Sequence, residues 1–154
     1  MKQTSASVNN NEALASVALG YLLKGYGTIT AAKAMLVLPF ILHPPTVRKL
    51  RGSSLKRSLE EFIVKNPECF ISFNARFTDY LALSVNAVTI LQEMNIITVL
   101  RDQLNYNYAS DFSPEYTRQV GKRATDFFAA IDVLADLFRN QSENSLYLKL
   151  KIEL

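Results

Sequence analysis

Hydrophobic positions recur at helical spacing along most of the chain, which predicts a mainly α-helical domain. The first helix follows the polar segment 1–10, for which we expect a disordered tail, and it ends at a pair of glycines. The segment 31–42 is apolar nearly all round, with Thr28 or Thr30 as its N-cap, so other helices must cover it on several sides. Pro39 removes a backbone donor there and predicts a kink or a break.

Three further helices are predicted in the middle of the chain. Ser53 or Ser54 caps the first of them, Asn66 begins the second, and Ser84 caps the third. Asn95 suits the left-handed residue that ends the third. The second helix carries a largely aromatic stripe, which we interpret as core because packing requires one-sided periodicity. Its members are Phe70, Phe73, Phe77, Tyr80 and Leu81.

The last third of the chain combines one long helix with segments typical of strands. β-Branched residues in 96–100 predict a strand, with 106–108 as the candidate second strand of a hairpin. The segment 113–115 opens the final helix, which Gly121 bends. Hydrophobic and polar residues then alternate over 146–154, which predicts an amphipathic strand that either completes the sheet or pairs with a partner's sheet edge. Its apolar face consists of Leu146, Leu148, Leu150, Ile152 and Leu154.

A capped helix over 84–95 followed by a strand is the order in which a winged-helix domain presents its second helix and its wing. This helix contains no Lys or Arg, whereas a helix that reads the DNA major groove brings cations or amides to phosphates and base edges. Its outward positions are Asn86, Thr89, Gln92 and Glu93. We therefore predict one domain over 11–154 that is mainly α with a small β element. It is a winged-helix-like helical domain, used for protein contact, with about six helices, a wing strand and a C-terminal strand.

Composition narrows the chemistry that the chain can support. A length of 154 residues suits one domain with a real core. The single cysteine, Cys69, excludes an internal disulfide, and the single histidine, His43, excludes a Cys/His zinc cluster. The N-terminus has no signal-peptide pattern, and the apolar run 34–42 is too short to cross a bilayer. We predict a cytoplasmic protein that does not contact membranes.

No group of residues has the spacing of a catalytic site. Cys69 and His43 are distant in sequence, the glycines form no phosphate loop, and Glu60 and Glu61 lie on the exposed face of a helix. The sequence thus predicts a protein that is not an enzyme. We expect no catalytic residues, no cofactor, no metal and no small-molecule substrate.

Basic residues form one local cluster with a possible function. The net charge of +3 is too small to indicate nucleic-acid binding by itself. Five cations without an intervening acid nevertheless lie within the ten residues 48–57, and they either contact phosphate or an acidic partner or form a solvated rim. We call them the basic segment: Arg48, Lys49, Arg51, Lys56 and Arg57. A smaller cluster on the final helix, with the same two interpretations, consists of Arg118, Lys122 and Arg123.

The segment from Ala34 to His43, followed by Thr46 and Arg48, resembles a family signature. The pattern Leu-Val-Leu-Pro-x-x-Leu-His-x-x-Thr-Arg is that of the small middle components of bacterial three-component ABC or SMC-like ATPase systems. Here Val47 intervenes before the arginine. Further similarities lie at Asn66-Pro67-Glu68, Phe73, Ala75-Arg76, Ser84, Ala87, Lys122-Arg123-Ala124 and Phe127-Phe128. The family's usual ending, a short glycine-containing strand with Arg-Pro, is not found in the tail.

The resemblance implies a non-catalytic adaptor encoded between an SMC-like coiled-coil ATPase and an effector such as a nuclease, as in Lamassu-type antiphage defence. Such an adaptor would bind near the ATPase heads or neck, hold the effector inactive, and reach DNA through the complex. An alternative is a winged-helix transcription regulator that binds DNA with the basic segment and the wing. A small toxin-like or antitoxin-like partner is a third hypothesis.

Overall fold

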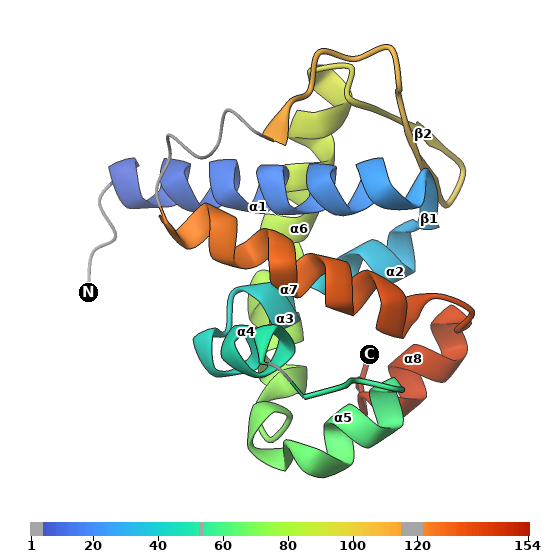
Figure 1. The fold of residues 1–154 in the computed structure, drawn as a ribbon. Coiled ribbons are helices and arrows are strands. Elements are labelled where there is room, and N and C mark those ends of the chain that lie inside the picture. The colour runs from blue at the N-terminus through green and yellow to red at the C-terminus, as the bar shows by residue number, and fades with distance from the viewer. Residues whose placement is uncertain (1–4, 53, 115–121) are drawn as a thin grey trace.

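The computed structural model describes residues 5–52, 54–114 and 122–154. It is mainly helical with a small antiparallel sheet, which confirms the predicted fold class (Figure 1). The elements in chain order are α1 (Ser5–Tyr26), β1 (Thr28–Thr30), α2 (Ala31–Met35), α3 (Val37–Ile41), α4 (Pro44–Arg51), α5 (Leu59–Lys65), the 3₁₀ helix η1 (Pro67–Cys69), α6 (Phe73–Glu93), β2 (Ile97–Leu100), β3 (Gln103–Tyr106), α7 (Lys122–Phe138) and α8 (Glu143–Lys149).

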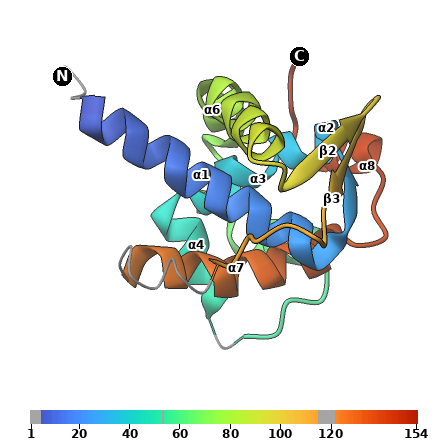
Figure 2. The ribbon, with the colours of Figure 1, turned by 90° about the horizontal axis from the view of Figure 1, so that it is seen from above.

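Helix α1 is longer than the hydrophobic pattern predicts. It begins at Ser5, so the expectation of a disordered tail over 1–10 is wrong for residues 5–10. Residues 1–4 lie outside the described part of the chain. Seen from above, α1 runs between α6 on one side and α7 on the other, and it packs against both (Figure 2). This position explains why Leu19 and Leu23 are fully buried.

The sheet has the strand order β1–β3–β2, with both pairs antiparallel. Leu104 at its centre pairs with Ile29 on one side and Val99 on the other. The strand predicted at 96–100 is confirmed as β2 (Ile97–Leu100), and Asn95 follows the end of α6 with the expected positive φ of 57°. The second hairpin strand is β3 rather than 106–108, because Arg101 adopts a φ of 57° and reverses the chain in a tight turn.

The break expected from Pro39 lies one turn before the proline. Helices α2 and α3 are separate and meet at Leu36. In an unbroken helix the nitrogen of Pro39, which carries no hydrogen, could not donate to the carbonyl of Met35, and the proline ring would clash with that carbonyl. The helix is therefore interrupted at Leu36, next to Met35. Thr30 caps α2 as predicted by accepting a hydrogen bond from the amide of Lys33. Every residue of α3 is buried.

Three predicted helix starts in the middle of the chain are wrong. Ser58, not Ser53 or Ser54, caps α5, by accepting a hydrogen bond from the amide of Glu61 at 3.1 Å. Ser53 itself lies outside the described residues. Asn66 precedes only the short η1, and α6 begins at Phe73.

Ser84 begins no helix, because α6 continues through it for 21 residues. No glycine or proline interrupts this stretch, and packing against α1 and α3 supports both halves as one helix. The Ser84 hydroxyl is buried and has no hydrogen-bond partner among the described residues. Of the predicted aromatic stripe, Phe73 and Phe77 are buried, whereas Leu81 is 38% exposed.

The C-terminal segment is a helix, so the predicted strand over 146–154 is wrong. Ser142 caps α8 by accepting a hydrogen bond from the amide of Ser145 at 3.2 Å. Leu146 and Leu150, four residues apart, face the core, whereas Leu148 is 79% exposed. Leu146 and Leu150 share one face of a helix as well as one face of a strand, because they are four residues apart, and the Ser142 cap favours the helix.

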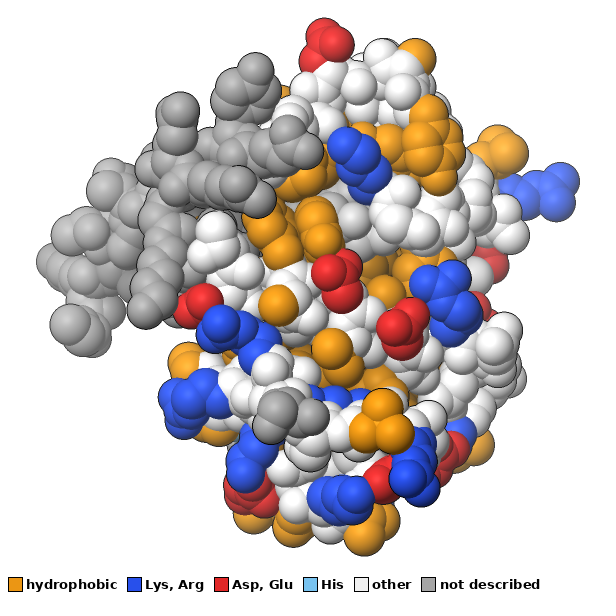
Figure 3. All heavy atoms as spheres, in the orientation of Figure 1, with side chains coloured by type: hydrophobic (Ala, Val, Ile, Leu, Met, Phe, Trp, Pro, Cys, Tyr) orange, Lys and Arg blue, Asp and Glu red, His pale blue; other side chains and the backbone are white. Residues whose placement is uncertain are grey.

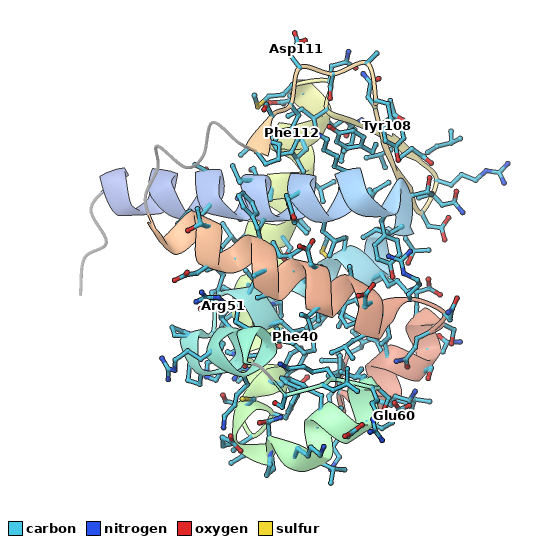
Figure 4. All side chains as sticks on the ribbon, viewed as in Figure 1. Phe40, Arg51, Glu60, Tyr108, Asp111 and Phe112 are labelled. Atoms are coloured by element: carbon cyan, nitrogen blue, oxygen red, sulfur yellow. The ribbon has the colours of Figure 1, made fainter. Side chains whose placement is uncertain are left out.

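The final long helix, α7, is described from Lys122 to Phe138. Of its predicted opening at 113–115, Ser113 and Pro114 are described and are not α-helical, whereas Glu115 and the predicted bend at Gly121 lie outside the described residues. Phe40 on α3 lies at the centre of the core, with its ring edge-on to Phe73 at 4.8 Å and to Phe138 at 5.6 Å between centroids. The segment predicted to be central therefore joins α6 and α7 (Figure 4).

Candidate functional site

The basic segment lies on the surface, at the end of α4 and in the chain that leads to α5. Lys and Arg side chains gather over this part of the molecule (Figure 3). Four of the five cations are exposed, and Lys56 is half-buried. Placement alone therefore leaves both interpretations of the segment open.

Contacts within the domain occupy three of these cations. Arg51 forms an ion pair with Asp126 of α7 at 3.1 Å (Figure 4), and Lys49 lies 3.8 Å from Glu68. The Lys56 ammonium donates to the carbonyl oxygen of Gly52. These contacts join α4 to α7 and η1, so the segment offers less free positive charge than its sequence suggests.

Two arginines remain available to a partner. Arg48 and Arg57 are exposed and form no ion pair with the described residues. Arg57 does act at a distance, because it contributes to lowering the pKa of Glu61, after the dominant effect of Lys65. In the smaller cluster, Arg118 and the side chains of Lys122 and Arg123 lie outside the described part of the structure.

The signature residues converge on a buried polar network rather than on an open site. Arg76 is 8% exposed and donates from Nη2 to the carbonyl of Cys69 at 2.7 Å and from Nη1 to the Ser72 hydroxyl at 2.6 Å. Its Nε donates to the carbonyl of Pro39 at 3.1 Å. The Arg76 guanidinium therefore links α3, η1 and the start of α6 by hydrogen bonds.

Thr46 brings His43 and Cys69 into the same network. The Nδ1 of His43 lies 2.7 Å from the Thr46 hydroxyl oxygen, and that hydroxyl also interacts with the Cys69 thiol. Burial, followed by the nearby charges of Arg76 and Arg48, lowers the pKa of His43. Burial also raises the pKa of the Cys69 thiol, which opposes formation of the nucleophilic thiolate. This arrangement suits packing of α4 better than catalysis.

The outer face of α6 is accessible, and its second half carries no cation. The four predicted outward residues are all exposed: Asn86, Thr89, Gln92 and Glu93. Val85 is 50% exposed beside them, and Leu81 is 38% exposed. The reason is that neighbouring elements cover only one side of α6. We define the α6 outer face as Leu81, Val85, Asn86, Thr89, Gln92 and Glu93.

A groove of about 370 Å³ lies between α1 and the end of α6, and sequence analysis missed it. Phe112, from the chain after β3, forms one wall. Its ring fits closely over Gly20, where a Cβ atom would lie 2.8 Å from the ring's ζ carbon. A glycine inside a long helix was the available signal, because such a residue often marks a close approach.

The C-terminal segment provides no strand for a partner. Leu146 and Leu150 are buried, Ile152 is half-buried, and Leu148 is exposed. Tyr147 donates its hydroxyl to the carbonyl of Ala32 at 2.8 Å, and Lys149 forms an ion pair with Glu60. The helix thus packs on its own domain, because its apolar side chains are already used there.

Among the described residues, no helix is long and apolar enough to cross a membrane. The same residues contain no group of three or more His, Cys, Asp or Glu side chains that could hold a metal ion.

A family model matches this chain over residues 9–154. The matching family is described as ABC-three component (ABC-3C) system Middle Component 3. No curated protein and no solved structure matches this chain. The matched range includes the signature segment, the α6 outer face and α8. The chain therefore belongs to the Middle Component 3 family of ABC-three component systems.

Proposed function

We propose that this chain is a non-catalytic adaptor subunit that contacts an SMC-like coiled-coil ATPase and its effector in an antiphage defence complex of the Lamassu type. Membership of a middle-component family supports partnership with other components of a multi-component ABC system. The ATPase, the effector and the defensive role are the finer parts of the proposal, and they rest on the resemblance of the signature segment.

The observation that most directly supports the proposal is that the α6 outer face is exposed, partly apolar and free of cations. Leu81 and Val85 expose apolar surface next to uncharged amide and hydroxyl groups, and the outward charge in this half of the helix is Glu93. Such a surface gains free energy by burial against protein, at about 25 cal/mol per Å² of apolar area. Against DNA the glutamate would face phosphates of the same sign.

The sheet supports a winged-helix-like use of the domain. Strand β1, directly after α1, pairs with β3 of the hairpin that follows α6. The hairpin projects at its turn, where Leu100 is 69% exposed. A projecting wing beside an accessible helix provides two adjacent contact elements for the ATPase.

Binding between purified proteins tests the proposal. The ATPase from the neighbouring gene should co-elute with this chain in size-exclusion chromatography at micromolar concentration. Val85→Lys places a charge on the α6 outer face and should weaken binding about tenfold or more. Val64→Lys is the matched control, because Val64 is 78% exposed on α5, a different helix. Separate elution of the two wild-type proteins would refute the adaptor function.

A transcription regulator is the second candidate, and the exposed Arg48 and Arg57 favour it. It predicts that the isolated protein binds one operator duplex tightly, with an affinity that falls steeply as salt rises. Fluorescence anisotropy at two salt concentrations separates the hypotheses. Duplex binding that persists at physiological salt, without the ATPase, would favour the regulator.

A further inference from the structure

The groove between α1 and the end of α6 has an apolar floor. Its apolar lining residues are Ala13, Val17, Ile90, Leu91, Met94, Ile96 and Phe112. Met94 is 64% exposed at the edge of this floor. A large exposed apolar side chain beside a concave apolar surface is typical of a site for a macromolecular partner.

A second hollow of about 390 Å³ adjoins the first, and the two share Met94, Ile96 and Phe112 as lining residues. Figure 4 shows Phe112 between α1 and the end of α6, with Asp111 further out. Two adjoining hollows can each take a side chain from successive turns of a helix, whose pitch is about 5.4 Å.

Charge around the two hollows indicates the chemistry of their occupant. Glu12 lines the first hollow and Asp111 lines the second. Among the described residues that line either hollow, none is Lys or Arg. Carboxylates at the edge of an apolar groove attract cations and repel phosphate, which favours a basic peptide segment over nucleic acid.

We propose that this groove, termed the Phe112 groove, binds an amphipathic helix of the ATPase or effector. That helix inserts apolar side chains into both hollows and carries Lys or Arg opposite Glu12 and Asp111. The inference rests on the proposed function, because it assigns a docking segment within the same complex. It differs from it in locating the contact in the hollow between α1 and the end of α6, which adjoins the α6 outer face where Asn86 donates a hydrogen bond to the Glu12 carboxylate.

The affinity of groove variants for the purified partner subunits tests the proposal. Ala13→Arg fills the first hollow with a long cation, and Asp111→Lys reverses the charge of the second. Each should weaken binding about tenfold or more, and Asp111→Lys should also reduce the salt dependence of binding. The matched controls are Ala129→Arg and Asp136→Lys, at exposed positions of α7 that line neither hollow, and they should stay within about twofold.

A photo-crosslinking residue in place of Ala13, in the assembled complex, identifies the occupant directly. The expected crosslinked peptide comes from the ATPase or effector, with apolar residues three or four apart and flanking Lys or Arg. A crosslink to a second copy of this chain, or to an acidic segment, would overturn the proposal.

The outcomes separate the two proposals. If wild-type protein forms no complex with either neighbouring gene product, both the adaptor function and its groove are refuted. If the complex forms and both Ala13→Arg and Asp111→Lys bind as wild type, the groove alone is refuted. Normal circular dichroism of each variant shows that weaker binding does not come from unfolding.

Discussion

The Nε of Arg76 donates a hydrogen bond to the carbonyl oxygen of Pro39, over 3.1 Å and across 37 positions of sequence. Pro39 breaks the helix before it, and the guanidinium that supports α3 comes from α6. The same side chain bonds to the carbonyl of Cys69, and its guanidinium carbon lies 5.4 Å from the centre of the Phe73 ring. The signature proline and this arginine are thus one structural unit.

Arg76→Met should destabilise the fold strongly. Methionine keeps most of the side-chain volume but leaves the carbonyls of Pro39 and Cys69 without these donors, at about 1–3 kcal/mol for each buried acceptor. We expect a total loss of about 3 kcal/mol in the free energy of unfolding, measured by urea denaturation. Arg48→Met, at an exposed position, is the control and should change stability by less than about 0.5 kcal/mol. Equal values for the two variants would contradict the structural role.

Stability should fall as pH is lowered through a window just below 6.5, because of His43. Burial and nearby arginines lower the folded-state pKa of His43 below its ordinary value of 6.5. Between these two pKa values the unfolded chain binds more protons than the folded one, so acid favours unfolding. The loss ends below the folded-state pKa.

His43→Gln isolates this pH effect, because the chain contains no other histidine. Urea denaturation between pH 5 and 7.5 should give a sloping free energy for the wild type and a flatter one for the variant. A slope that survives the substitution would assign it to other groups. Glu60 and Glu143 are unsuitable sources, because their pKa values are lowered from 4.5 and they titrate below this window.

Leu146→Ala and Leu148→Ala should differ sharply if the C-terminal segment is helical. Leu146 is fully buried, so its truncation should cost about 2–5 kcal/mol. Leu148 is 79% exposed and should cost less than about 0.5 kcal/mol. A strand would place both leucines on one face, so similar losses in thermal denaturation would favour the strand.

Charge reversal distinguishes the arginine of the basic segment that stabilises the domain, Arg51, from the two that are available to a partner, Arg48 and Arg57. Arg51→Glu replaces an ion pair with repulsion against Asp126 and should destabilise the packing of α4 on α7 by about 1 kcal/mol. Arg48→Glu with Arg57→Glu should leave stability nearly unchanged. If the segment contacts DNA held by the complex, the double variant should weaken DNA-stimulated ATPase activity. Unchanged stimulation would leave these arginines as solvated surface.

Gly20→Ala should displace Phe112 and alter the Phe112 groove. The added methyl would lie 2.8 Å from the ring, and the ring must move because α1 cannot. We expect a cost of about 1–3 kcal/mol in the wild type and a smaller cost in a Phe112→Leu background. A double-mutant cycle by urea denaturation measures the difference, and simple additivity would show that the two residues do not interact.

Elements with strong local signals were predicted well. Four features depend on residues close together in sequence: the helical body of α1, the central position of the segment that holds Phe40, the left-handed Asn95 and the strand β2. Periodicity, capping and β-branched density report on such local preferences. Pro39 likewise predicted an interrupted helix, and only its position was displaced to Leu36.

Elements whose form depends on distant partners were missed or misassigned. Strand β1 has three residues and exists because Leu104 pairs with Ile29. Ser84 resembles a cap, but packing carries α6 through it. Leu146 and Leu150 fit both the helical and the strand period, and the burial of these two with Leu148 exposed is that of a helix.

The candidate sites likewise include features that local sequence predicts and features that depend on distant segments. The residues of the basic segment and the cation-free half of α6 were visible in the chain, because charge and residue type are properties of single positions. The ion pair between Arg51 and Asp126, the packing of Phe112 over Gly20 and the hollow that Phe112 lines depend on the tertiary fold. Long-range packing decided them, since ion pairs and grooves arise from segments that no local preference brings together.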